Sequence, residues 1–159
     1  MIRALDAGVS PNIETKDGLT PLHWAATSGG AFLIEFLLIA DADIEARTCP
    51  DGFTPLHMTV EGESLEEARE LLRCGADINA RNAYGQTSLR MAVETSGVYE
   101  VVSPRMARFL IEMGADLNAR DDAGYSIARA AQGAIPFESQ SQEAQEIVAL
   151  LAERGAMLE

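Results

Sequence analysis

Hydrophobic and polar residues follow one another along this chain in a pattern that returns about every 33 residues. Turn-forming glycines recur at spacings of 34, 33 and 39 residues, at Gly18, Gly52, Gly85 and Gly124. A second series of turn residues lies where apolar, helix-like segments end, at Gly8, Asp41, Gly75, Gly114 and Gly155. The pattern predicts a repeat unit that consists of a turn, a helix, a loop, a second helix and the next turn.

Each predicted first helix begins with residues that favour a helix N-terminus. Asp17-Gly18 suits a tight turn, and the hydroxyl of Thr20 can cap the helix that follows. Pro21 occupies the first helical position, where its missing N–H does no harm. The later repeat units carry a capping hydroxyl in the same place, in the pairs Thr54-Pro55, Thr87-Ser88 and Ser126-Ile127.

The predicted second helices carry paired apolar residues on one face. These pairs are Leu37-Leu38, Leu71-Leu72, Leu110-Ile111 and Leu151-Ala152. Gly75, Gly114 and Gly155 predict left-handed helix ends, which glycine adopts readily. Asp41 takes this position in the first full repeat, at a cost of about 1 kcal/mol. We expect the last helix over roughly Gln142 to Arg154, with a polar outer side.

The strings TPLHWAATSG, TPLHMTVEG, LLRCGADINARN and IEMGADLNARD resemble the ankyrin repeat, a unit of about 33 residues with a β-turn and two antiparallel helices. The resemblance implies an all-α repeat fold, an ankyrin solenoid of helix-turn-helix units joined by β-hairpin-like turns. It implies a single domain with a half repeat (1–14) and four full repeats (15–48, 49–81, 82–120 and 121–159). The short half repeat indicates either a minimal cap or a fragment of a longer protein, and we favour the fragment.

Composition narrows the class of protein further. The 47% apolar content suffices for a packed interior, and the net charge of −13 disfavours nucleic acid and favours a protein partner with a basic or neutral surface. Cys49 and Cys74 match neither a disulfide framework nor a metal-ligand spacing, which predicts a reducing, cytoplasmic location. The most apolar run, Ala31 to Ala40, has about half the length that spans a bilayer, so we expect no membrane partner.

The sequence contains little that suggests catalysis. Its two histidines, His23 and His57, both lie in TPLH strings, where the ankyrin resemblance implies hydrogen bonds between adjacent repeats. No serine or cysteine has a His and carboxylate partner in a plausible site, and there is no glycine loop that could hold a phosphate. We therefore predict no catalytic, cofactor-binding or metal-binding residues, and no enzyme.

Three features differ from what a scaffold needs, and the first is the set of turn tips. The resemblance implies that the turns and the starts of the first helices form a concave recognition face. By register this face contains Asp17, Leu19, Asp51, Phe53, Arg81, Tyr84, Gln86, Arg120 and Tyr125. Aromatic residues and arginine are enriched at binding hot spots. We interpret Phe53, Tyr84 and Tyr125 as an aromatic ladder; the alternative is that they only cover neighbouring turns.

The second feature is a pair of insertions between helices in the third and fourth full repeats. They lie around Ser96 to Ser103 and Ala134 to Gln142. Their apolar residues form a second candidate surface: Tyr99, Val101, Val102, Ile135 and Phe137. The alternative is that the two loops pack against each other.

The third feature is an apolar stripe on the predicted second helix of the first full repeat. Phe32, Phe36 and Ile39 have the spacing of one helix face, and register places that face outward. Ile2 and Leu5 could cover part of the stripe. If they do not, the stripe is a partner surface or the interface of a homodimer.

These features predict a protein–protein interaction module, an adaptor or scaffold that presents a concave surface to a protein partner. The alternative is a dedicated inhibitor, such as a bacterial immunity-type protein, whose acidic surface masks a basic site on an enzyme.

Overall fold

The structure, a computed structural model, describes residues 8–28, 30–93, 103–132 and 142–156. Within these residues the chain forms eight α-helices and no strand, which confirms the predicted all-α repeat. The helices divide between two compact units, an N-terminal unit (residues 1–77) and a C-terminal unit (residues 78–159). Each unit is described by itself below.

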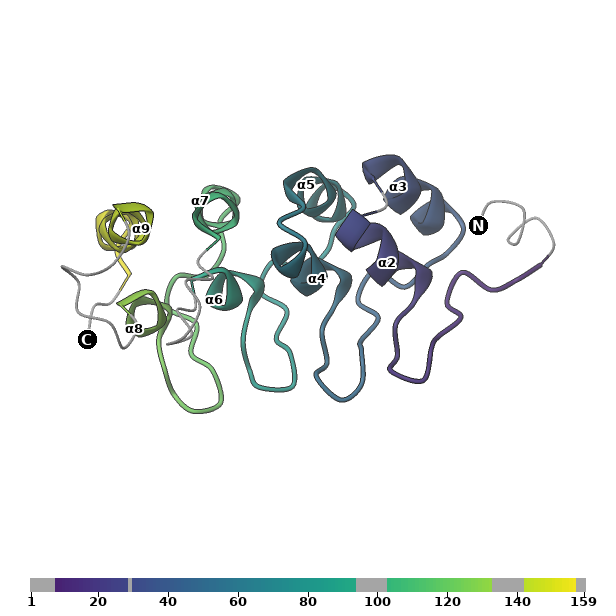
Figure 1. The fold of residues 1–159 in the computed structure, drawn as a ribbon, viewed down its shortest axis with the longest axis horizontal. Helices are drawn as coiled ribbons and strands as arrows, with labels where there is room; N and C mark the ends of the chain where they lie inside the picture. Colours follow the sequence, from purple (N-terminus) through teal and green to yellow (C-terminus); the bar gives the residue numbers. More distant parts are fainter. Residues whose placement is uncertain (1–7, 29, 94–102, 133–141, 157–159) are drawn as a thin grey trace. The chain divides into compact units, whose positions relative to one another are not determined.

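The N-terminal unit contains two helix pairs. They are α2 (Pro21–Ser28) with α3 (Ala31–Ile39), and α4 (Pro55–Glu61) with α5 (Leu65–Arg73). Helix α2 also packs on α4, and α3 packs on α5, so both layers are continuous across the unit. In Figure 1 the turns project beyond the first helices, on the side away from the second helices. The core consists mainly of Leu22, Ile34, Leu37, Leu56 and Leu71, all buried.

The C-terminal unit repeats this plan with α6 (Ser88–Ala92) and α7 (Pro104–Glu112), then α8 (Ile127–Gln132) and α9 (Gln142–Glu153). Its largest buried side chains are Leu89, Met106, Leu110, Ile127, Ile147 and Leu151. One predicted inner-face residue is corrected, because Ala152 is exposed although its neighbour Leu151 is buried. The exposed side of α9 therefore includes the second residue of this apolar pair.

The predicted helix ends are confirmed. The hydroxyls of Thr87 and Ser126 accept the backbone N–H of Arg90 and Arg129, at 3.2 and 3.1 Å. At the C-termini, left-handed backbone follows the second helices, with φ of 66° at Asp41 and between 85° and 97° at Gly75, Gly114 and Gly155. Asp41 therefore adopts a conformation that glycine adopts at the other three ends.

Both histidines bind the start of their own helix, and His23 also makes the expected hydrogen bond to the adjacent repeat. The backbone N–H groups of Thr20 and Thr54 donate to Nδ1 of His23 and His57, at 3.1 and 3.2 Å. Nδ1 of His23 is thus an acceptor, and its Nε2–H donates to the carbonyl of Phe53 in the next turn, at 2.9 Å. Burial lowers the pKa of His23, so the ring is held neutral. His23 therefore joins two adjacent repeats by a hydrogen bond.

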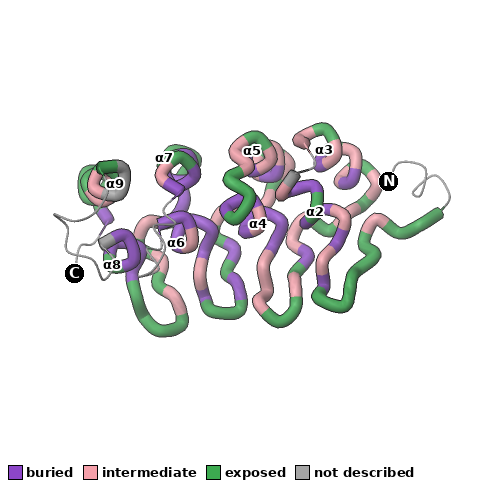
Figure 2. Tube along the Cα trace, viewed as in Figure 1, coloured by how far each residue is buried: buried purple, intermediate pink, exposed green. Residues whose placement is uncertain are grey.

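All four turns share one pattern of backbone hydrogen bonds. An N–H at the start of each turn donates to the residue before the cap, in the pairs Thr15–Leu19, Thr48–Phe53, Asn82–Gln86 and Asp121–Tyr125. Adjacent turns are also joined within each unit, since Cys49 donates to the carbonyl of Asp17 and Asp122 donates to that of Tyr84. The turn tips are largely exposed, whereas the first helices are largely buried (Figure 2).

In three successive repeats, beginning with the half repeat, a side chain also binds the backbone of the next repeat. The side-chain oxygens of Asn12, Glu45 and Asn79 accept the backbone N–H of Asp43, Asp77 and Asp116, at 2.7, 2.7 and 2.8 Å. Glu45 therefore does with a carboxylate what the two asparagines do with a neutral amide. Burial raises the pKa of Glu45, and the hydrogen bond from Asp77 only partly opposes that change.

Glu45→Gln is expected to raise the free energy of unfolding at neutral pH by a few tenths of a kcal/mol. The effect is small because solvent partly screens a half-buried carboxylate. A carboxyl whose pKa is raised in the folded state stabilises that state below its ordinary pKa, and this contribution is lost as pH rises through the raised value. Gln keeps the acceptor for Asp77 and removes the charge. Urea denaturation should therefore show that the free energy of unfolding of the variant rises relative to that of the wild type from pH 4 to pH 7. A difference independent of pH would contradict this.

Candidate partner-binding surfaces

The turns of the C-terminal unit enclose an open groove of about 600 Å³. We call it the tyrosine groove; it is lined by Ala83, Tyr84, Gln86, Arg90, Asp121, Asp122, Ala123 and Tyr125. Its two tyrosines are 53% and 43% exposed, which is high for side chains of this size. The groove thus contains Tyr84, Gln86 and Tyr125 of the predicted recognition face.

A buried ion pair lies within this groove. Nη2 of Arg90 is 3.2 Å from Oδ2 of Asp121, and the two side chains are only 7% and 6% exposed. The other carboxylate oxygen of Asp121 accepts the backbone N–H of Tyr125 at 2.9 Å. The guanidinium of Arg129 lies 4.5 Å from the centre of the Tyr125 ring, a cation–π contact. Tyr125 is therefore held in place before any partner arrives.

The remaining polar residues predicted in this part of the face hold the turns. Arg81 donates to Asp122 at 2.9 Å, and Arg120 donates to the carbonyl of Gly124 at 2.9 Å. The side-chain oxygen of Gln86 accepts from the Asn82 amide at 3.1 Å. Gln86 and Asp122 line the groove, whereas Arg81 and Arg120 do not.

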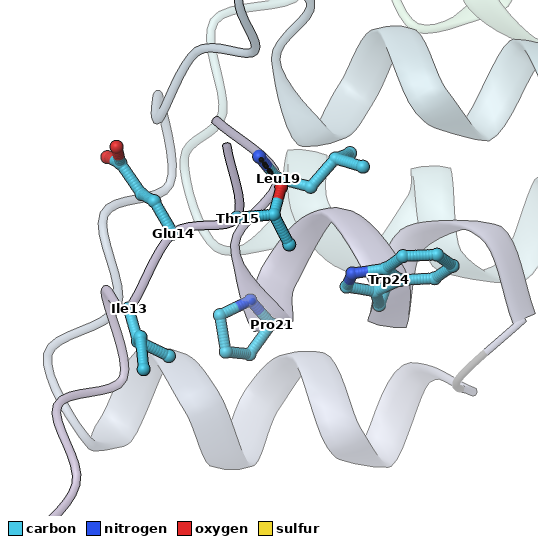
Figure 3. A pocket seen from close by; sticks show the side chains of 6 residues that line it. All are labelled: Ile13, Glu14, Thr15, Leu19, Pro21 and Trp24. Atoms are coloured by element: carbon cyan, nitrogen blue, oxygen red, sulfur yellow. Dashed lines mark hydrogen bonds between the residues drawn. The ribbon is translucent and has the colours of Figure 1, made fainter. Parts of the chain in front are cut away.

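The N-terminal unit has a smaller pocket of about 230 Å³ (Figure 3), which we call the tryptophan pocket. It is lined by Ile13, Glu14, Thr15, Leu19, Pro21 and Trp24. Sequence reasoning selected Leu19 but missed Ile13 and Trp24, which is 56% exposed. A signal was present, because Trp24 is the single tryptophan of the chain and lies between the core positions Leu22 and Ala25.

The predicted aromatic ladder stays a prediction, and its three residues hold different places in their turns. Phe53 and Tyr125 both precede a helix cap and accept the bond that closes their turns, whereas Tyr84 lies two residues before that position and accepts from the next turn. Phe53 is also half-buried, with its ring stacked on His57 at 5.9 Å between centroids. The three rings do not occupy equivalent positions. Of the other predicted residues, Asp17 is exposed and Asp51 is half-buried.

The apolar stripe is exposed in part. Phe32 and Ile39 of α3 are 72% and 78% exposed, as predicted, but Phe36 is half-buried. Glu35 on the same helix pairs with Arg73 of α5 at 3.2 Å. Ile2 and Leu5, which could cover the stripe, lie outside the described residues. The homodimer through this stripe stays a prediction.

The second candidate surface, which consists of Tyr99, Val101, Val102, Ile135 and Phe137, lies outside the described residues. In the part of the chain that is described, no group of three or more His, Cys, Asp or Glu side chains could hold a metal ion. None of the described helices has the length and apolar character needed to cross a membrane.

Comparison with known proteins supports the repeat assignment. A family model described as ankyrin repeats (3 copies) matches residues 1–82 and 31–121. No curated protein matches the chain. Ankyrin repeats are generally protein–protein interaction modules and are typically non-enzymatic. Because the matched segments together cover residues 1–121 of 159, the chain belongs to the ankyrin repeat family.

Proposed function

We propose that this protein is an adaptor or scaffold module that binds a protein partner through its turns and first helices. The observation that carries the proposal is the tyrosine groove, in which two exposed tyrosines flank a buried ion pair. Tyrosine is enriched at binding hot spots because its ring supplies contact area and its hydroxyl a polar contact.

The groove is suited to binding because its floor is already ordered. Asp121 holds both Arg90 and the backbone of Tyr125, and Arg129 covers the Tyr125 ring. Side chains fixed before association lose less conformational entropy when a partner binds.

The free cysteines, exposed Cys49 and half-buried Cys74, agree with a cytoplasmic location.

A second candidate function is that of a dedicated inhibitor of an enzyme with a basic site. The observation that favours it is the charge of −13, which is unevenly spread. Residues 1–77 contain 14 acidic against five basic side chains, a net charge of −9, whereas residues 78–159 contain 11 against seven, a net charge of −4. The electrostatic field of this negative charge would speed association with a basic partner, and salt would screen it.

Tyr84→Ala combined with Tyr125→Ala is expected to weaken binding of a partner isolated with the wild-type chain by at least about 2 kcal/mol, with unchanged helix content. Isothermal titration calorimetry measures the loss. Met113→Ala is the matched control, because Met113 is 45% exposed and does not line the groove. It should leave the affinity almost unchanged.

Unchanged affinity of the double variant would contradict a role for the groove. The same titration at low and high salt separates the two functions. A tight one-to-one complex that salt weakens steeply supports the inhibitor, whereas shallow salt dependence supports the adaptor.

A further inference from the structure

We propose that the tryptophan pocket of the N-terminal unit binds one arginine side chain of a protein partner. The site is separate from the tyrosine groove and does not depend on it, since each lies within its own unit. The proposal requires the protein partner to have an exposed arginine.

The shape of the pocket fits the stem and head of a long side chain. Its walls are mostly apolar, with Pro21 and Trp24 from α2 and Ile13 and Leu19 from the turn that precedes this helix. In Figure 3 the Trp24 indole and Pro21 lie along α2, and Ile13 and Leu19 extend from the turn segments beside them. The volume of about 230 Å³ suits one side chain rather than a whole helix. The methylene groups of arginine would cover the apolar walls.

The electrostatic surroundings select a cation. Glu14 lines the pocket with its carboxylate directed outward, away from Trp24, in Figure 3, and exposed Asp17 follows in the same turn. The side-chain oxygen of Asn12 accepts the backbone N–H of Asp43, so exposed Asp43 lies beside the segment that carries Ile13 and Glu14. Lys16 is the opposing charge in this turn, within a unit whose net charge is −9.

Arginine fits this combination better than the alternatives. Its planar guanidinium can stack on an exposed indole face, and its positive charge is attracted by the acidic side chains of this unit. Leucine would use the apolar walls and gain nothing from the acidic rim. An acidic side chain would be repelled. The pocket therefore favours a side chain that is apolar along its length and cationic at its end.

The test uses the full chain, labelled with ¹⁵N, and three short peptides that differ at one central residue. The probes are Ac-Gly-Ser-Xaa-Ser-Gly-NH₂ with arginine, its neutral isostere citrulline, or leucine. The Trp24 indole N–H gives a signal of its own, because the chain has one tryptophan. The arginine peptide should shift this signal and the amides of Thr15 and Leu19 in a saturable way, at least about fivefold more tightly than the citrulline peptide.

Two variants assign the effect. Glu14→Gln should weaken binding of the arginine peptide several-fold and leave the citrulline peptide unaffected, whereas Glu66→Gln, an exposed carboxylate of α5 in the same unit, should change neither. Trp24→Leu should abolish the response at Thr15 and Leu19. Equal or tighter binding of the citrulline or leucine peptide would overturn the proposal, as would the lack of a saturable shift. Either result leaves the effect of the Tyr84 and Tyr125 substitutions on the protein partner as a separate measurement.

Discussion

Arg90→Met is expected to lower the free energy of unfolding by about 3 kcal/mol or more. The substitution removes the cation that lies 3.2 Å from Asp121 in a site where both side chains are more than nine-tenths buried. The remaining carboxylate keeps one hydrogen bond, from the backbone of Tyr125. A buried charge without its counterion is strongly destabilising, although the intact pair need not stabilise the fold by the same amount. Urea denaturation followed by circular dichroism measures the change.

Arg81→Met is the matched control, because it breaks an ion pair of similar length between two exposed side chains, Arg81 and Asp122. It should lower the free energy of unfolding by at most about 1 kcal/mol. Adding Asp121→Asn to the Arg90 variant should recover part of the loss, since it removes the orphaned charge. Similar effects of the two arginine substitutions would show that burial of the Arg90–Asp121 pair does not govern its energetics.

Gly18→Ala is expected to lower the free energy of unfolding by about 2 to 4 kcal/mol. Gly18 has a φ of +72°, which strains any residue with a Cβ. An added Cβ would also lie 2.9 Å from the carbonyl oxygen of Arg47 and 3.0 Å from the backbone nitrogen of Cys49. These atoms belong to the next turn and cannot rotate away. The clash would also disturb the hydrogen bond from Cys49 to Asp17. Fluorescence of Trp24 during urea denaturation reports this unit directly.

Gly124→Ala provides the comparison, because Gly124 has the same place in its turn and a φ of +82°, with no atom within 4 Å of an added Cβ. It should cost only the conformational strain, about 1 to 2 kcal/mol. Equal losses at the two glycines would mean that contact between adjacent turns contributes little at Gly18.

The predicted helices and their ends needed no tertiary information. Thr87 and Ser126 cap their helices through the next residues along the chain, and Gly75, Gly114 and Gly155 end helices through their own backbone freedom. Such interactions are local, and they recur at equivalent positions in successive repeats. Ala152 is exposed, contrary to its predicted place on the inner face, because alanine fits either face of a helix and its type alone does not decide burial.

The candidate sites were predictable only as a region. Register placed Tyr84 and Tyr125 on the turns, and both line the groove. Register could not pair Arg90 with Asp121, because these residues are 31 positions apart and come into contact only when two repeats pack. Trp24 was missed for a related reason. A helical tryptophan can face the core or solvent, and Leu22, Ala25 and Ala26 fill the buried face of α2.

The repeating pattern of apolar, capping and turn residues was therefore enough to predict the ankyrin fold, since those residues return at nearly the same spacing along the chain. Packing between repeats decided the rest: which side chains bind the next repeat, as Arg81 does, and which remain exposed, as Trp24 and Tyr84 do. A binding surface is what remains after such contacts form. The recurring TPLH string consequently defines the register of the fold, whereas the residues around it that are not needed for packing define what the protein can bind.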